Sequence, residues 1–107
     1  MAILESKFKA RVMKDLKAVE GMFVFSKEAK SLRGYPDIIG CYRGRFFGWE
    51  LKRSESEARK QTGRIVLQRH ILTQVQQSGG IGEIVHPDNY QEKLSALLQS
   101  DPIPDNH

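Results

Sequence analysis

Two acidic residues and a lysine in the middle of the chain have the types and the spacing to hydrolyse a phosphodiester bond. Asp37 precedes the apolar stretch IIGCY, and Glu50 and Lys52 lie at the end of the next stretch, RFFGWELK. Carboxylate oxygens are the ligands that Mg²⁺ prefers, and bound Mg²⁺ lowers the pKa of a water molecule and neutralises charge that develops on phosphorus. A lysine beside them can orient the attacking water or stabilise the transition state.

A β-hairpin between these residues is expected to bring the two carboxylates together. The dipeptide Arg43-Gly44 separates the two stretches, and its glycine supplies the positive φ that a tight hairpin turn requires. With this two-residue loop Asp37 faces Glu50, with Cβ atoms roughly 4.5–5.5 Å apart. Lys52 shares the face of Glu50 because strand side chains alternate, and the residues beside Glu50 point into the core. A three-residue or bulged loop would shift this pairing.

The flanking helices favour a functional site over the simpler interpretation of a turn-capping aspartate and exposed strand residues. The apolar stripe of a helix expected over residues 3–20 also contains Glu5, with Asp15 near it, and the sequence does not choose between these two acids. A carboxylate that faces a core needs a partner. In the next expected helix Gln68 lies within the apolar arc of residues 65–75. Its amide either faces the sheet or extends outward from the edge of the core.

These residues are expected to be positioned by a mixed α/β domain with the order α-β-β-β-α-β-α and a sheet of about four strands flanked by helices. The expected strands are residues 22–26, 37–42, 45–52 and 81–86, and the expected helices are residues 3–20, 65–75 and 90–98. The charged stretch 53–64 has no clear period and is expected to be an exposed loop or the start of a helix. Residues 1–100 form the single predicted domain, and residues 101–107 are expected to be a disordered tail.

Composition narrows the class of protein. The 107 residues suffice for one domain, and 39% hydrophobic with 28% charged residues is typical of a globular protein rather than a disordered or membrane protein. The net charge of +4 suits a polyanionic partner.

Cys41 is the only cysteine, which excludes an intrachain disulfide. The histidines lack zinc-ligand spacing and are expected at the surface. With neither a signal peptide nor a membrane-length apolar run, the protein is expected to be soluble and intracellular.

The motifs together resemble a known family, the PD-(D/E)xK nucleases with the restriction-endonuclease-like fold. Its signature stands here as Pro36-Asp37 followed by Glu50-Leu51-Lys52. Within that superfamily the chain is most similar to the virus-type replication-repair nuclease (VRR-NUC) group, which adds an acid on the preceding helix and a glutamine on the following helix. Glu5 and Gln68 match these additions, so the resemblance runs from about Glu5 to Gly80. The long polar stretch 53–64 departs from the family pattern.

The resemblance implies roles for individual residues. It implies a site for Mg²⁺, with Mn²⁺ as a substitute, whose ligands are Asp37, Glu50, the carbonyl of Leu51 and, directly or through water, Glu5. Lys52 would assist the attacking water, and Gln68 would support the site. The side chains expected to contact DNA phosphates are Arg53, Arg59, Lys60, Arg64 and Lys9, although each could equally be part of a solvated cationic surface.

The implied activity is endonucleolytic hydrolysis of DNA, selective for branched structures such as Holliday junctions and serving DNA repair or recombination. One such centre cuts one strand, so cutting two strands would require a homodimer, and free-standing domains of the VRR-NUC group act as dimers. A nuclease-fold module that binds nucleic acid without cutting it is one alternative. A restriction-type endonuclease is another, for which 107 residues leave little room for recognition segments.

Overall fold

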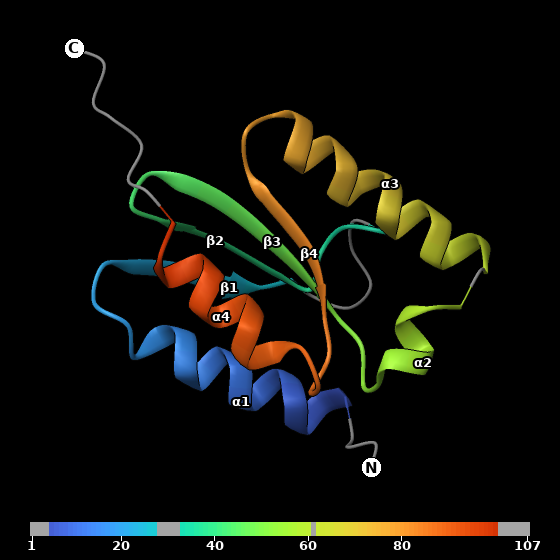
Figure 1. Ribbon diagram of the computed structural model, residues 1–107, viewed down its shortest axis with the longest axis horizontal. Helices are drawn as coiled ribbons and strands as arrows, with labels where there is room; N and C mark the ends of the chain where they lie inside the picture. The colour runs from blue at the N-terminus through green and yellow to red at the C-terminus, as the bar shows by residue number, and fades with distance from the viewer. Residues whose placement is uncertain (1–4, 28–32, 61, 101–107) are drawn as a thin grey trace.

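The computed structural model describes residues 5–27, 33–60 and 62–100. It consists of a four-stranded sheet with helices on both faces (Figure 1). The elements are α1 (Glu5–Lys17), β1 (Met22–Ser26), β2 (Ile38–Tyr42), β3 (Arg45–Leu51), α2 (Glu55–Ala58), α3 (Gly63–Gln77), β4 (Ile81–Val85) and α4 (Tyr90–Leu98). The predicted mixed sheet and its order are confirmed, with one addition, the short helix α2 within the stretch 53–64. The tail 101–107 lies outside the described residues.

The sheet has the strand order β1-β2-β3-β4. β1 pairs with β2, and β2 with β3, in antiparallel fashion, whereas β3 and β4 are parallel. A parallel pair needs a crossover connection, and α3 supplies it. β3 is therefore a central strand with hydrogen-bonded neighbours on both sides, which suits the strand that carries Glu50 and Lys52.

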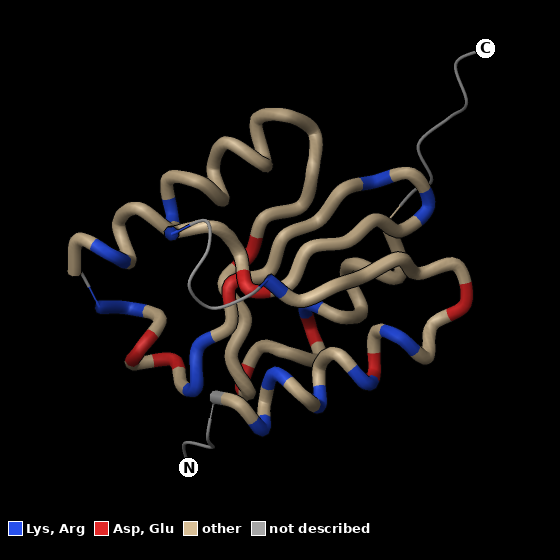
Figure 2. Tube along the Cα trace, turned by 180° about the vertical axis from the view of Figure 1, so that it is seen from behind, with Lys and Arg blue, Asp and Glu red and all other residues tan. Residues whose placement is uncertain are grey.

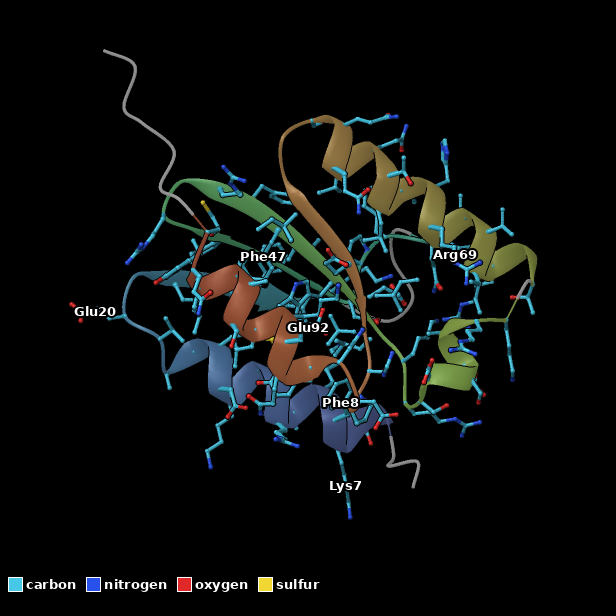
Figure 3. All side chains as sticks on the ribbon, in the orientation of Figure 1. Lys7, Phe8, Glu20, Phe47, Arg69 and Glu92 are labelled. Carbon is cyan, nitrogen blue, oxygen red and sulfur yellow. The ribbon has the colours of Figure 1, made fainter. Side chains whose placement is uncertain are left out.

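The face of the sheet that α1 and α4 cover holds the main core (Figure 1). Phe8, Val12 and Leu16 recur every four residues along α1 and are completely buried, as the apolar stripe of that helix predicts. Figure 3 shows the contrast between Lys7, which extends into solvent, and Phe8 beside it, which lies toward the sheet. The ring of Tyr90 at the start of α4 packs edge-on against Phe8, with centroids 5.7 Å apart. These contacts fix α1 and α4 to each other and to the sheet.

The opposite face carries α3, which packs on β3 and β4. Two glycines that are partners in the sheet, Gly48 and Gly82, make the close approach possible. A Cβ atom at Gly82 would lie 2.6 Å from the carbonyl oxygen of Leu72 in α3, and one at Gly48 would lie 2.7 Å from Pro36 Cγ. Because neither glycine has a side chain, α3 can approach β4 closely, and the segment leading to Asp37 can approach β3 closely.

Among the helices of the described residues, none has the length and apolar character that a membrane crossing requires.

Candidate active site

The hairpin between β2 and β3 places Asp37 beside Glu50. Its turn residues Arg43 and Gly44 both have positive φ, 54° and 82°, as a two-residue turn of this kind requires. Strand pairing then runs from Tyr42 opposite Arg45 to Ile38 opposite Trp49, which confirms the predicted register. Just beyond the last pair, Oδ2 of Asp37 accepts a hydrogen bond of 2.8 Å from the backbone N–H of Leu51. This bond anchors the aspartate to the strand that carries Glu50.

Glu50 is a buried carboxyl group, with only 3% of the residue exposed. Its Oε1 accepts a 2.9 Å hydrogen bond from Nε2 of Gln68 and lies 3.7 Å from Nζ of Lys52. Its Oε2 is buried and has no hydrogen-bond partner among the described residues. Burial and the nearby carboxylate of Asp37 raise the pKa of Glu50 to about 8, against a smaller lowering by Lys52 and Lys27. The ionised form of Glu50 is therefore unfavourable in the site without a further positive charge.

Gln68 faces the sheet rather than extending from the edge of the core. It is 3% exposed and lies between the buried apolar residues Ile65 and Ile71 of α3. While its Nε2 donates to Glu50, its Oε1 is buried and has no partner within the described part of the chain. A buried carbonyl oxygen normally finds a hydrogen-bond donor or a cation, so this oxygen and Oε2 of Glu50 both have unused acceptor capacity.

These groups line a cleft with a volume of about 900 Å³. The residues around it are Ser6, Lys9, Lys27, Arg33, Gly34, Asp37, Glu50, Gly63, Arg64, Leu67 and Gln68. They come from α1, the end of β1, the segment before β2, β3 and the start of α3. Four of the lining side chains are cationic and two are carboxylates, so a positively charged rim surrounds an acidic centre. Lys9 and Arg64, both predicted to contact DNA, are part of this rim.

Sequence reasoning missed two cations of the cleft, Lys27 and Arg33. Lys27 follows β1, and its backbone N–H donates to the carbonyl of Asp37 over 2.8 Å, which continues the β1–β2 ladder. Its Nζ donates to the carbonyl of Tyr35 over 3.0 Å. The signal was present in the sequence, because pairing the predicted strands 22–26 and 37–42 antiparallel brings the end of the first to the start of the second. No comparable signal indicates Arg33.

A second, smaller cavity of about 380 Å³ shares Arg64 with the cleft and is also lined by Lys52. Its other lining residues are Arg53, Glu57, Lys60, Thr62 and Ile65. Glu57 binds both Arg53 and Lys60, at 3.1 and 2.9 Å, and these hydrogen bonds lower the pKa of Glu57. Of the predicted phosphate contacts, Arg53, Lys60 and Arg64 thus gather here.

Arg59 does not join this group. Its side chain is 76% exposed, pairs with Glu55 on α2, and lines neither cavity. Helix α2 is oriented by its contacts instead: Ser54 caps its start through the N–H of Glu57, and Arg69 of α3 donates to the carbonyl of Ala58 over 2.6 Å (Figure 3). The structure therefore gives Arg59 an ion pair on the surface of α2 rather than a place in the cleft.

The structure shows a structural partner for Asp15, one of the two acids on the first helix. Asp15 accepts a 2.6 Å hydrogen bond from the hydroxyl of Tyr90, between α1 and α4. Burial and Asp15 together raise the pKa of that tyrosine. Asp15 thus has a structural partner in the core away from the cleft. Glu5 begins α1 one residue before Ser6, which lines the cleft, but its side chain lies outside the described residues.

Other potential metal ligands are few. Among the described side chains, no group of three or more His, Cys, Asp and Glu residues is placed to hold a metal ion. His70 is exposed, as predicted, whereas the surface location expected for His86 is wrong: it is 8% exposed because it follows β4 at its packed end. His107 lies outside the described residues. Asp37, Glu50 and backbone carbonyls such as that of Leu51 are the oxygen donors that the described site offers.

The parallel β3–β4 pair, the crossover helix and the hairpin bearing two carboxylates and a lysine define a restriction-endonuclease-like fold, as predicted. A solved structure described as a "VRR_NUC domain protein" is similar over 97% of this chain and 95% of its own, with a TM-score of 0.72 and 14% sequence identity. The chain thus shares the fold of that VRR_NUC domain protein. No protein-family model matches the sequence, and no curated protein matches it.

Proposed function

We propose that this protein is a metal-dependent nuclease that hydrolyses phosphodiester bonds of DNA. One observation carries the proposal: Asp37 and Glu50 converge in a cleft whose rim is cationic, and both Lys52 and Gln68 contact the buried carboxyl group of Glu50. A cationic rim attracts a polyanionic backbone, and an acidic centre attracts the divalent cation that phosphodiester hydrolysis uses. The nuclease-type fold supports the same conclusion.

The residues of the site fit Mg²⁺ or Mn²⁺. Oε2 of Glu50 is a buried oxygen without a partner in the described part of the chain, and burial together with the nearby Asp37 raises the pKa of Glu50. A bound cation would offset both the desolvation of Glu50 and its repulsion by Asp37. Asp37, Glu50 and the carbonyl of Leu51 would hold the ion, with Glu5 joining directly or through water. When bound, the ion supplies charge neutralisation at phosphorus and an acidified water.

Lys52 is placed to orient the attacking water or to stabilise a negative charge. Its side chain is only 12% exposed, and its ammonium lies 3.7 Å from Oε1 of Glu50. A restrained ammonium beside the carboxylates would orient the attacking water and stabilise negative charge on the phosphoryl oxygens. Gln68 holds Oε1 of Glu50 in place through its 2.9 Å hydrogen bond, and so fixes the direction in which Oε2 points.

The phosphates on either side of the reacting bond would contact the cationic rim. Lys9, Arg33 and Arg64 line the cleft, and Arg53 and Lys60 line the adjoining cavity. Contacts to phosphate position a duplex without reading its sequence. We propose selectivity for branched DNA, Holliday junctions included, with two copies of the chain acting together, because one cluster of this kind cuts one strand and two-fold symmetry is the commonest way to pair two.

The test is cleavage of a panel of labelled linear duplex, flap, splayed and four-way substrates with Mg²⁺, Mn²⁺ or excess chelator. Asp37→Asn, Glu50→Gln and Lys52→Ala should each lower the cleavage rate by on the order of 10²–10³ without loss of DNA binding. Glu83→Gln is the matched control: this acid pairs with Lys93 of α4, on the other face of the sheet, at 3.1 Å. Its rate should equal that of the wild type.

Undiminished cutting in chelator, or by Asp37→Asn, would overturn the metal-dependent mechanism. Binding of every substrate without cutting under any metal condition would instead identify a nuclease-fold binding module. Equal rates on linear and four-way DNA would remove the branched-DNA part of the proposal and leave the nuclease part standing.

A further inference from the structure

The face of the sheet that carries α3 is only half covered. Helix α3 packs on β3 and β4, while β1 and β2 extend beyond it. Seen from behind in Figure 2, no helix passes in front of β1. Large apolar side chains occupy this open half. Phe23 is 66% exposed, Phe25 47%, and Phe46 and Tyr35 each 44%. A monomer normally buries such a set of aromatic side chains.

These side chains form an ordered surface, which we call the Phe23 face: Phe23, Phe25, Ile39, Cys41, Phe46 and Tyr35. Strand pairing aligns Phe23, Cys41 and Phe46 in a row across β1, β2 and β3. In the next row Ile39 lies beside Phe25. The rings of Phe23 and Phe25 pack edge to face with centroids 6.0 Å apart, so they hold each other in an exposed position.

A recess lies beside the protruding rings. Its volume is about 310 Å³, and it is bounded by Tyr35, Phe46 and the α3 residues Ile71 and Val75. A dry apolar cavity of roughly 150 Å³ holds a benzene molecule, so the recess has room for a phenyl ring. The same surface thus presents a projecting phenylalanine and a receptacle for one. A two-fold contact uses both at once, because each copy contributes the same patch.

Charge distinguishes a protein partner from DNA on this surface. Binding of an unpaired strand by stacked bases needs cations that follow the backbone along the aromatic residues. No lysine or arginine is among the six residues of the Phe23 face. Lys27, which continues the row of Phe23 and Phe25, donates its ammonium to the carbonyl of Tyr35. Depletion of charge together with enrichment in aromatic residues is the composition of the centre of a protein interface.

The area agrees with a second copy as the occupant. An aromatic side chain offers about 150–250 Å² for burial, so four rings near half exposure present roughly 400 Å². A stable interface buries about 800 Å² per partner, and its polar rim supplies the remainder.

We propose that the Phe23 face is the surface on which two copies of this chain associate, with Phe23 of each copy seated in the recess between Phe46 and α3 of the other. The inference rests on the proposed function only for its purpose, the pairing of two active centres. Because Phe46 lies on β3, the strand that carries Glu50, this association would fix the spacing of the two clefts.

Sedimentation velocity of the full chain over a micromolar concentration series, without DNA or metal, tests the proposal. The wild type should sediment as a dimer and Phe23→Asp as a monomer. Phe23→Ser, a milder change, should raise the dimer dissociation constant about a hundredfold, because the two-fold contact loses two apolar anchors worth ~1.4 kcal/mol each. Val66→Asp is the matched control, because Val66 is 52% exposed on α3 and outside the recess. It should remain a dimer, and circular dichroism should show all four proteins folded.

Each alternative result has a definite meaning. A monomeric wild type, or a Phe23→Asp variant that remains dimeric, overturns the proposal. So does a monomeric wild type whose affinity for a labelled single strand falls in Phe23→Ser, since the face would then bind bases. Because sedimentation is read without DNA, these failures leave the nuclease proposal untouched. Conversely, a dimer that depends on Phe23 but cuts no substrate supports this inference and contradicts the nuclease.

Discussion

The two faces of the sheet differ in how they use buried space. The face under α1 and α4 is filled by apolar side chains such as Phe8, Phe47 and Trp49, all completely buried. The face under α3 holds a buried carboxyl group, a buried amide and a cleft, and beyond α3 it exposes phenylalanines. Burying Glu50 carries a free-energy cost that appears as its raised pKa. The first face therefore stabilises the domain, and this stability allows the second face to hold an unfavourable cluster.

The largest expected effect is loss of stability on the first face. Trp49→Ala should lower the free energy of unfolding by about 3–5 kcal/mol, because it removes a fully buried ring that packs on Phe47 and Tyr90. Phe46→Ala, on the same strand but 44% exposed on the other face, should cost clearly less. Chemical denaturation monitored by circular dichroism gives both values. Equal losses of unfolding free energy would mean that the two faces do not differ in their contribution to stability.

Gly82→Ala tests how closely α3 must approach the sheet. The added Cβ would lie 2.6 Å from the backbone oxygen of Leu72, so α3 must move, at a cost of about 1–3 kcal/mol. The movement should draw Gln68 away from Glu50 and lower the cleavage rate. Gly63→Ala is the control for melting alone, since nothing lies within 4 Å of its added Cβ but the residue lines the cleft. Thermal melting and cleavage assays are the measurements, and unchanged melting of Gly82→Ala would contradict the packing argument.

The cost of burying Glu50 should be visible as a pH dependence. Its pKa is about 8 in the folded protein and near 4.5 when unfolded, so the folded state binds more protons between these values. Stability of the metal-free protein therefore falls as pH rises from about 4.5 to about 8. Glu50→Gln has no carboxyl group to titrate at this position. Its melting temperature in chelator should therefore exceed that of the wild type at pH 8 and approach it at pH 5. A difference that does not change with pH would refute the assignment to Glu50.

The smallest expected effects separate the two acids of the first helix. Asp15→Asn weakens the bond to Tyr90 and should lower stability by about 0.5–1.5 kcal/mol while leaving cleavage unchanged. Glu5→Gln is expected to weaken metal-dependent cleavage and to change stability little. Titrating Mg²⁺ against the cleavage rate of each variant measures the difference. If only Asp15→Asn changed the Mg²⁺ concentration needed for cleavage, Asp15 rather than Glu5 would belong to the metal site.

Much of the fold and the centre of the site follow from short-range rules. A two-residue turn fixes the pairing of its strands, so the position of Asp37 next to Glu50 could be predicted from Arg43-Gly44 alone. The apolar periods of α1 and α3 likewise indicate which faces they bury, and Gln68 lies on one of them. The helix α2 could also have been predicted, because Ser54 and Glu57 have the spacing of a capping box.

The rest depends on how distant elements pack. Arg33 reaches the cleft through the tertiary arrangement of α1, α3 and the segment before β2, which no local pattern encodes. Arg59 has the same charge and sequence neighbourhood as Lys60, yet a local ion pair with Glu55 keeps it on the surface. The burial of His86 likewise results from its place after β4. Charge and spacing indicate candidates, but the packing of helices against the sheet selects among them.

The two-residue turn also has a consequence for how reliably the chain folds. Sliding β2 past β3 by one residue exchanges the two sets of side chains, since alternate residues point to opposite sides. Glu50 would then be driven into the hydrocarbon interior, and Trp49 would emerge into the cleft beside Gln68. Both exchanges are unfavourable, so the misaligned hairpin is less stable than the native one. The residues of the candidate active site therefore also favour the native register of the hairpin.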